Sequence, residues 1–276
     1  MARLELKRAC YARQAGTLVP SGAPLAVIQD AFGDFIGGHL HRSLAGIDPG
    51  GVSAHFMCST MIDVAFASGA LDWLQLQQRI GRISGFAPGT LVNAYECASW
   101  GYALRHALRP PARPVRVLLS IVDLNLLNLS YWNSNPYWGA SGFGIATVLL
   151  ECAPGAAEDL VVGCAKTHNA VAELGIALRN TLAQRPGLKL AKPFFPSTLT
   201  GLLERQVGNA VHLEDLHPHV GHCFGSDPWL SVAYAASRSG ETGSCLAASL
   251  ALNGYWAMAE VQIDPDGLFR VDGLPA

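Results

Sequence analysis

The segment that decides the fold covers residues 93–104 and reads Asn-Ala-Tyr-Glu-Cys-Ala-Ser-Trp-Gly-Tyr-Ala-Leu, with Cys97 at its centre. The apolar run at 91–94 is short enough for a buried strand, and residues 99–108 have the apolar spacing of a helix. Cys97 therefore lies at a strand-to-helix junction. A thiol at a helix N-terminus faces the positive end of the helix dipole, which lowers its pKa. Cys97 is thus a candidate nucleophile, and the alternative is a small buried core cysteine.

The composition predicts a compact globular protein with a sizeable core. The chain has 276 residues, of which 50% are apolar and 14% are charged. The net charge of -2, without a run of Lys or Arg, gives no basic surface for nucleic acid or an anionic membrane. The best apolar window, residues 115–129, is interrupted by Asp123, Asn125 and Asn128, so no membrane span is predicted. Glu5 would interrupt the apolar core of a secretory signal, which favours a cytoplasmic location.

The seven cysteines are scattered and form no Cys-x-x-Cys pair, which indicates free thiols in a reducing compartment. His217, His219 and His222 lie close together in the sequence and raise the alternative of a metal site. Only the adjacent Cys223 could complete their ligand set, and its spacing suits a loop poorly. We therefore predict neither a metal nor a cofactor.

Hydrophobic periodicity predicts an alternation of helices and strands. The expected helices are 24–44, 69–80, 99–108, 171–182, 199–207 and 229–237, and the expected strands are 52–60, 91–94, 115–122, 144–151, 245–252 and 255–263. Asp227 is the expected N-cap of the helix at 229–237, with Pro228 at its first position. The Asn253-Gly254 pair is the strongest hairpin signal.

The two parts of the chain share one pattern. In each, a helix and a strand precede a loop that carries Cys97 or His222, and a helix and two apolar strands follow. This predicts a duplicated α/β unit. We divide the chain into residues 1–155, which carry the cysteine, and residues 156–276, which carry the histidine loop and the Gly254 turn.

Several of these segments resemble β-ketoacyl-acyl carrier protein synthase III, a member of the thiolase superfamily. Residues 96–104 are similar to that family's Ala-Cys-(Ala/Thr)-Gly-(Phe)-x-Tyr-Ala-Leu, with Cys97 on the nucleophile. Residues 117–121 resemble the following strand, and 141–150 resemble Phe-Gly-Asp-Gly-Ala-Gly-Ala-Val-Val-Leu, with Ser141 in place of the acidic residue. Residues 220–227 resemble the His-Gly-Asn-Thr-Ser-Ala-Ala-Ser segment, and 252–256 the Gly-rich turn.

This resemblance implies a thiolase-like five-layer α/β/α/β/α fold with two similar halves, assembled as a dimer. It implies that Cys97 is the nucleophile and that the N–H groups of Cys97 and Gly254 form an oxyanion hole. His222 occupies the family asparagine, where it would accept the thiol proton or hold the thioester carbonyl. The alternative is a loop histidine bonded to a backbone carbonyl.

Two departures from the family bear on the reaction. The family histidine of the Pro-His-Gln-Ala-Asn segment is replaced by Phe194, which argues against decarboxylative condensation. The N-terminal loop that holds coenzyme A in the family is missing or rebuilt. The aromatic loop at 131–138 would line an acyl channel or pack against a partner. The predicted substrate pocket consists of Trp100, Trp138, Phe194, Cys223 and Phe224.

These features lead to two hypotheses for function. The first is an acyltransferase or condensing enzyme of the ketoacyl synthase III type, which takes an acyl group from a carrier-protein or coenzyme A thioester onto Cys97, in secondary metabolite or fatty acyl biosynthesis. The second is an accessory subunit that shapes the pocket of a full-length ketosynthase in a heterodimer, as opposed to a homodimer. The retention of Cys97 together with His222 and Gly254 favours the first.

Overall fold

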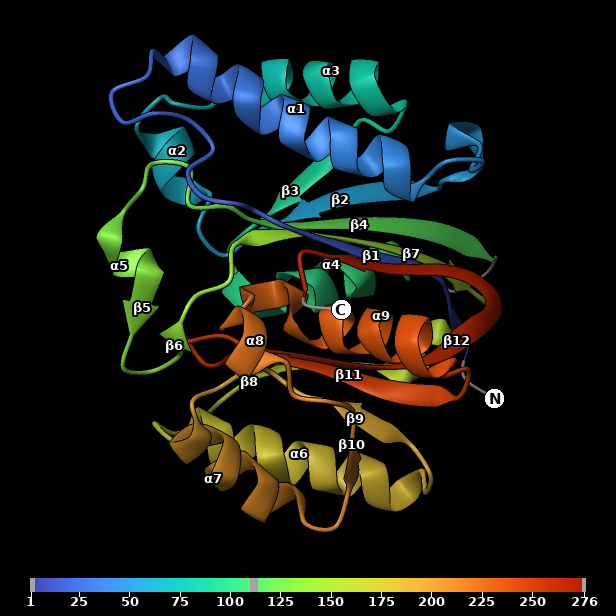
Figure 1. Ribbon diagram of the computed structural model, residues 1–276. Helices are drawn as coiled ribbons and strands as arrows, with labels where there is room; N and C mark the ends of the chain where they lie inside the picture. Colours follow the sequence, from blue (N-terminus) through green and yellow to red (C-terminus); the bar gives the residue numbers. More distant parts are fainter. Residues whose placement is uncertain (1–2, 110–113, 275–276) are drawn as a thin grey trace.

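The computed structural model of the chain describes residues 3–109 and 114–274. Its helices and strands form five stacked layers (Figure 1). Helices α1 (Leu25–Ser43) and α3 (Trp73–Ser84) form one outer layer, and α6 (Ala170–Gln184) and α7 (Ser197–Val207) form the other. Helices α4 (Ser99–Ala107) and α9 (Asp227–Ser239) form the layer between the two sheets. The predicted α/β/α/β/α layering is therefore confirmed.

The two sheets have the same strand order. The first runs β3 (Thr90–Val92), β2 (Ala54–Cys58), β4 (Val115–Asp123), β7 (Gly144–Cys152), β1 (Leu4–Arg13). The second runs β10 (Val211–His212), β9 (Lys189–Ala191), β11 (Ser244–Leu250), β12 (Tyr255–Asp272), β8 (Leu160–Cys164). In both, the third strand of the half comes first in this order and the first strand comes last. This order is what a duplicated unit predicts, and the division between residues 155 and 156 stays our proposal.

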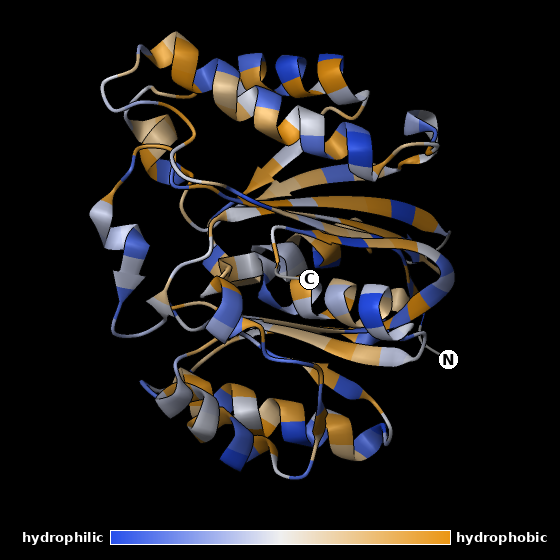
Figure 2. Ribbon diagram, viewed as in Figure 1, coloured by the Kyte–Doolittle hydropathy of each residue, from blue (hydrophilic) through white to orange (hydrophobic). Residues whose placement is uncertain are grey.

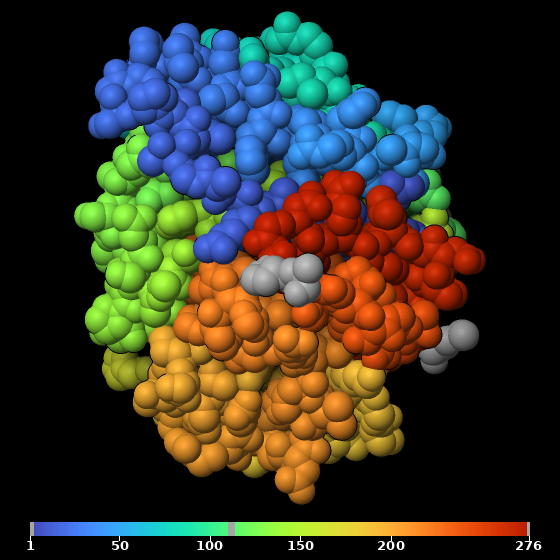
Figure 3. Space-filling view, in the orientation of Figure 1, coloured from blue at the N-terminus to red at the C-terminus, as the bar shows by residue number. Residues whose placement is uncertain are grey.

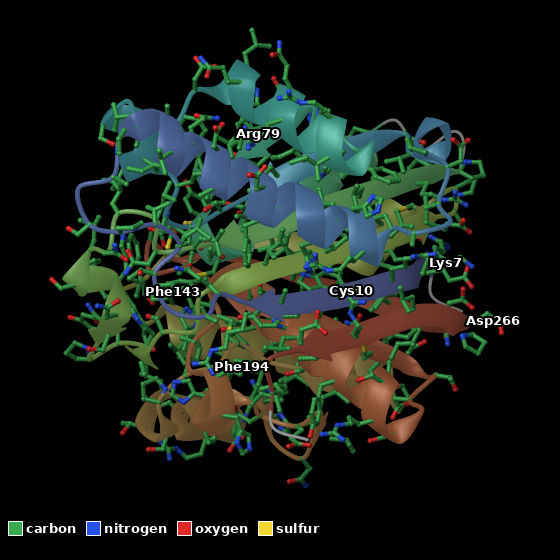
Figure 4. The ribbon with its side chains drawn as sticks, turned by 45° about the horizontal axis from the view of Figure 1, so that its top comes forward. Lys7, Cys10, Arg79, Phe143, Phe194 and Asp266 are labelled. Carbon is green, nitrogen blue, oxygen red and sulfur yellow. The ribbon has the colours of Figure 1, made fainter. Side chains whose placement is uncertain are left out.

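Strand β12 joins the two sheets. It pairs antiparallel with β11 up to Ser244 and Gln262, and from Gln262 onward it pairs parallel with β1. The ammonium of Lys7 lies 3.0 Å from the Asp264 carboxylate at this crossing, and Figure 4 shows Lys7 close to Asp266. The last part of the chain consequently lies between the N-terminal and C-terminal parts (Figure 3). The sequence predicted β12 only to residue 263 and did not predict β1, since charged residues interrupt both segments.

Apolar residues line the inner surfaces of the layers. Helix α1 buries Ile28, Phe32, Ile36 and Leu40, and its exposed positions carry both polar and apolar residues (Figure 2). Strands β4 and β7 are buried on both faces, as predicted. At about 1.5–3 kcal/mol for each large apolar side chain, this burial is the main stabilising contribution.

One predicted helix begins at the wrong residue. The sequence placed a helix at 69–80, but the chain forms α2 (Asp63–Ala67), turns at Gly69 with φ +72°, and starts α3 only at Trp73. The Asp72 carboxylate caps α3 by accepting a hydrogen bond from Gln75 N–H at 2.8 Å. A residue in the left-handed conformation ends a helix. The predicted helix was too long at its start because the apolar periodicity continues across the turn at Gly69.

Helix α4 approaches β12 so closely that only glycine fits at residue 101. A Cβ atom there would lie 2.3 Å from the Cβ of Ala257. We expect Gly101→Ala to lower the free energy of unfolding by about 1–3 kcal/mol through overpacking, as measured by urea denaturation. Gly38→Ala in α1 is the matched control, because its Cβ would meet only the end of Arg42 at 3.5 Å. The control should raise stability by about 0.5–1 kcal/mol. Equal effects of the two substitutions would contradict the tight contact.

Candidate active site

Cys97 lies in the short turn η2 (Glu96–Ala98) that leads from β3 into α4. Its side chain is buried and packs against Met61 and Phe224, with Trp132 and Phe143 partly covering them. Glu96 has φ +47°, a left-handed conformation that costs on the order of 1–3 kcal/mol for a residue of this type. Such strain directly before a thiol is typical of a residue that is held for chemistry.

His222 is the histidine that the structure brings to Cys97. Its Nε2 atom lies 3.8 Å from Cys97 Sγ, and its Nδ1 atom lies 2.7 Å from Asp227 Oδ2. All three side chains are buried. The backbone of His222 is fixed on both sides, because its N–H donates to Ala140 O at 2.8 Å and its carbonyl accepts from Gly142 N–H at 2.8 Å. The side chains of Cys97, His222 and Asp227 thus form a connected series.

Asp227 has a different role from the one predicted. It is the first residue of α9, and the N-cap is Ser226, which makes no side-chain cap bond. The Asp227 carboxylate instead points inward, where it accepts hydrogen bonds from Cys223 N–H at 2.6 Å and Phe194 N–H at 2.8 Å. Burial raises the pKa of Asp227, while His222 and the two N–H groups lower it. A carboxylate at Nδ1 favours the tautomer in which Nε2 is free to accept a proton.

The environment of Cys97 also corrects the prediction about its pKa. The helix N-terminus predicted a lowered value, but burial raises the pKa of the thiol well above its ordinary value. The nearby carboxylates of Asp123, Asp227 and Glu96 raise it further, and a hydrogen bond from Thr60 lowers it. In a buried site the cost of removing the thiolate from water exceeds the dipole effect. The resting form of Cys97 is therefore the neutral thiol.

Two residues that the sequence did not suggest complete the site. Thr60 follows β2, and its hydroxyl donates to Cys97 Sγ at 3.6 Å. Asp123 ends β4, and its Oδ1 atom accepts from Thr60 N–H at 2.6 Å and from Ser59 Oγ at 3.3 Å. Burial raises the pKa of Asp123 to about 6. The available signal was positional: polar residues end two neighbouring buried strands, β2 and β4, at one edge of the sheet.

Two of the predicted pocket residues lie against His222. The ring of Phe224 lies 4.8 Å from the His222 ring, and the ring of Trp138 lies 6.3 Å from it, measured between centroids. Trp138 is buried, and its Nε1–H donates to Ser141 Oγ at 2.8 Å. Ser141, in the position of the family's acidic residue, thus holds an aromatic wall of the site.

Three other predicted pocket residues have different surroundings. Trp100 lies in the core between the sheets, where its Nε1–H donates to Ser249 Oγ at 2.8 Å and its ring meets Trp229 edge-on at 5.0 Å. Phe194 is fully buried in the main core (Figure 4), and the neighbouring Phe195 stacks on His222 at 6.3 Å. Cys223 is buried and its sulfur accepts from Tyr11 Oη at 3.4 Å. The sequence suggested Trp100 and Phe194 by their position along a motif, which does not show which way a ring points, and their part in a substrate pocket stays a prediction.

The turn that carries Gly254 lies beside the nucleophile segment, since Asn253 N–H donates to Glu96 Oε2 at 3.4 Å. The Asn253-Gly254 hairpin itself is confirmed, with Gly254 at φ +85°. However, Gly254 N–H donates to Ala251 O at 3.0 Å within the turn. Its role as the second oxyanion donor, beside Cys97 N–H, stays a prediction.

The histidine cluster does not assemble as a ligand set. His217 Nε2 lies 3.0 Å from Trp138 O, which is a loop hydrogen bond. Within residues 3–109 and 114–274, no three His, Cys, Asp or Glu side chains come together as a metal site. In the same described ranges, no helix has both the length and the apolar character needed to cross a bilayer.

Solved structures decide the fold family. ChlB3, an acyltransferase, aligns with a TM-score of 0.68 at 13% identity, over 96% of this chain and 100% of its own. β-Ketoacyl-acyl carrier protein synthase III from Thermus thermophilus aligns with a TM-score of 0.63 at 13% identity, over 94% and 98%. The chain has the thiolase-like fold of ketoacyl synthase III. A third structure with this thiolase-like fold, the AntDE:AntF complex of a type II polyketide synthase, aligns with a TM-score of 0.60 at 11% identity, over 94% and 99%.

No protein-family description matches the chain, and no curated protein matches it in sequence. Identities of 11–13% to structures with the thiolase-like fold show the fold alone. Any function must therefore be argued from the site.

The raised pKa of Asp123 predicts a pH-dependent stability. In the unfolded chain its pKa is about 3.9, so between about pH 4 and pH 6 the unfolded state loses its proton while the folded state keeps it. The native protein therefore loses about 3 kcal/mol from this group as the pH rises across that range. We expect Asp123→Asn to be more stable than the native chain by about 2–3 kcal/mol at pH 8 and equal to it at pH 3.5, by urea denaturation.

Asp34→Asn is the control of opposite sign. Asp34 on α1 pairs with Arg79 (labelled in Figure 4), and this ion pair lowers the pKa of Asp34. This substitution should slightly destabilise the protein at pH 8 and have no effect at low pH. A stability difference for Asp123→Asn that does not vary with pH would contradict a buried, ionised Asp123.

Proposed function

We propose that this chain is an acyltransferase that carries an acyl group on Cys97. The observation that carries the proposal is the connected series of Cys97, His222 and Asp227, with 3.8 Å from sulfur to Nε2 and 2.7 Å from Nδ1 to the carboxylate. A nucleophile, a base and a group that orients the base are the three parts that covalent acyl transfer requires. The fold neighbours named as an acyltransferase and a ketoacyl synthase support the same class of reaction.

The first half-reaction loads the enzyme. His222 Nε2 takes the proton from Cys97 Sγ as the sulfur attacks the thioester carbonyl, because the thiol is neutral at rest. The bond from the acyl carbon to the donor sulfur then breaks, and the donor leaves as a thiol with the proton from the His222 imidazolium. The Asp227 carboxylate stabilises that imidazolium while it exists.

The second half-reaction passes the acyl group on. His222 Nε2 takes the proton of an acceptor hydroxyl or amine, which attacks the acyl carbon, and Cys97 leaves and regains the proton from the imidazolium. Decarboxylation of a malonyl unit is harder to support, because the ring of Phe194 is buried in the core where the family histidine was expected. Transfer to oxygen or nitrogen needs only the one histidine that the site contains.

The surroundings of Cys97 favour an apolar acyl group. Met61, Phe224, Trp132 and Phe143 pack around the thiol, and Trp138 extends this wall. Apolar walls with few polar groups suit a fatty or aryl chain. The donor in this proposal is an acyl thioester of a carrier protein or of coenzyme A. The AntDE:AntF neighbour contains a ketosynthase with an acyl carrier protein, which supports the carrier protein as the donor.

The alternative, an accessory subunit of a heterodimeric ketosynthase, has less support. An accessory chain has no need of a buried thiol in line with a histidine and a carboxylate, and keeping buried polar groups of this kind costs stability. Within our proposal the chain forms a dimer in a reducing cytoplasm, which keeps the thiol of Cys97 free.

Acyl loading is tested by incubating the purified chain with acetyl, hexanoyl and benzoyl thioesters of coenzyme A and of a loaded carrier protein. We expect a mass increase equal to one acyl group, which Cys97→Ala abolishes. Cys164→Ala is the matched control, because Cys164 is the exposed free thiol and should keep the adduct. An adduct that survives Cys97→Ala, or none from any donor, would contradict the proposal and favour the accessory subunit.

The roles of His222 and Asp227 are tested by the rate of the same loading step. We expect His222→Gln to slow loading by about 100-fold or more, since the thiol loses its base. Asp227→Asn should slow it by a similar factor, because the amide no longer selects the Nε2 acceptor tautomer. The reference is His217→Gln, whose ring contacts a loop carbonyl and which should load at the native rate. A normal loading rate in His222→Gln would exclude His222 as the base.

A further inference from the structure

Cys97 has a second polar neighbour besides His222. The hydroxyl of Thr60 donates to Cys97 Sγ at 3.6 Å, a normal length for a hydrogen bond to sulfur. Thr60 belongs to the turn between β2 and α2, whereas His222 comes from the C-terminal half of the chain. The thiol is therefore held from both halves.

Asp123 fixes the turn that presents this hydroxyl. Its Oδ1 atom accepts from Thr60 N–H at 2.6 Å and from Ser59 Oγ at 3.3 Å, and Ser59 Oγ accepts from Met61 N–H at 3.3 Å. Asp123 is 1% exposed, and its Oδ2 atom faces Gly225, where a Cβ would lie 3.8 Å away. Burying a carboxylate costs free energy unless its oxygens are hydrogen-bonded. The Oδ1 atom of Asp123 accepts its hydrogen bonds from the turn that carries Thr60.

The charge around the sulfur shows what the hydroxyl contributes. Asp123 at the end of β4, Asp227 on α9 and Glu96 in η2 all place negative charge near Cys97 and oppose its ionisation. Thr60 is the neighbour whose hydrogen bond favours the ionised sulfur. A hydrogen bond to a charged acceptor is about twice as strong as a neutral one, so this contact strengthens as the sulfur becomes negative.

We propose that Thr60 is a catalytic residue that donates a hydrogen bond to the Cys97 sulfur when the proton leaves it, and that Asp123 is the positioning residue that holds Thr60 in place. The inference rests on the proposed function only in taking Cys97 as the reacting thiol. The step changes no other bond: the sulfur proton goes to His222 Nε2, and the Thr60 hydroxyl keeps its own proton.

The test uses the intact chain and needs no acyl donor. We would measure the rate of alkylation of Cys97 by iodoacetamide from pH 6 to pH 10, with the modified peptide quantified by mass spectrometry. Thr60→Val removes the donor at nearly constant shape, and we expect it to slow alkylation several-fold at pH 7.5 and along the rising part of the pH profile, because the thiol pKa lies well above its ordinary value. Thr60→Ser keeps the hydroxyl and should stay within about twofold of the native rate. Equal rates for the Val and Ser variants would overturn the role of Thr60.

The role of Asp123 is separated from its charge by comparing two neutral variants. Asp123→Asn keeps an oxygen for Thr60 N–H, whereas Asp123→Ala does not. With Thr60 present, the Asn variant should alkylate several-fold faster than the Ala variant at pH 7.5. In the Thr60→Val background that difference should disappear, because there is then no hydroxyl for Asp123 to position. A difference that persists without the hydroxyl, or no difference when it is present, would overturn the positioning role.

A thermal unfolding scan of each variant checks that it is folded. If Asp123→Ala does not fold, the bulkier Asp123→Leu, which also lacks an acceptor, takes its place in the comparison. Failure of this inference is distinguishable from failure of the proposed function. If the native chain never forms an acyl adduct but its alkylation rate depends on Thr60, the role of Thr60 is supported and the acyltransferase proposal is contradicted. If the native chain forms the acyl adduct but Thr60→Val has no effect on alkylation, the acyltransferase proposal is supported and the role of Thr60 is contradicted.

Discussion

The rest of the site depends on the buried carboxylate of Asp227. It accepts hydrogen bonds from the backbone at Phe194 and Cys223 and lies 2.7 Å from His222 Nδ1, so one side chain joins the segment after β9, the histidine loop and the start of α9. A carboxylate that is removed from water costs several kcal/mol unless its oxygens are bonded. In the observed conformation the loop satisfies Asp227 and also directs His222 Nε2 toward Cys97. The position of the His222 ring is thus linked to the hydrogen bonding of a buried carboxylate.

The packing of the two central helices also determines the geometry of the site. Helix α4 follows directly on the turn that carries Cys97, and α9 begins with Asp227, so both helices begin at the same end of the molecule. Gly101 allows α4 to lie directly on β12, and Trp100 meets Trp229 of α9 edge-on at 5.0 Å. These contacts set the relative position of the two helix starts, and with it the 3.8 Å from sulfur to Nε2. Trp100, which the sequence predicted to line a pocket, thus packs against α9 near the start of both helices.

The sequence predicted most of the elements from local signals, and it predicted the layers and the pair of Cys97 and His222 from short motifs that resemble ketoacyl synthase III. Apolar periodicity marks α1, and the Asn253-Gly254 pair marks the hairpin. Asp227, Thr60 and Asp123 were not predicted as site residues, because their role depends on which way a side chain points after folding. Asp227 beside Pro228 has the local pattern of an N-cap, and only the packing of Phe194 N–H and His222 against it turns the carboxylate inward. Strand β1 was not predicted because its charged residues alternate with Leu4 and Leu6. It is stabilised by pairing with β7 and β12 rather than by a strong local strand signal.

The electrostatics of the site also bear on which half-reaction is difficult. Three carboxylates face a thiol whose pKa burial already raises, so a free thiolate is disfavoured. In the proposed loading step an imidazolium forms at His222, and the negative charge of Asp227 at 2.7 Å stabilises it. A long-lived ion pair of thiolate and imidazolium is therefore disfavoured, because the carboxylates around the site oppose a negative charge on the sulfur. In our proposal the proton therefore moves from sulfur to His222 as the new bond to carbon forms, and at neutral pH the resting thiol reacts only slowly with other electrophiles.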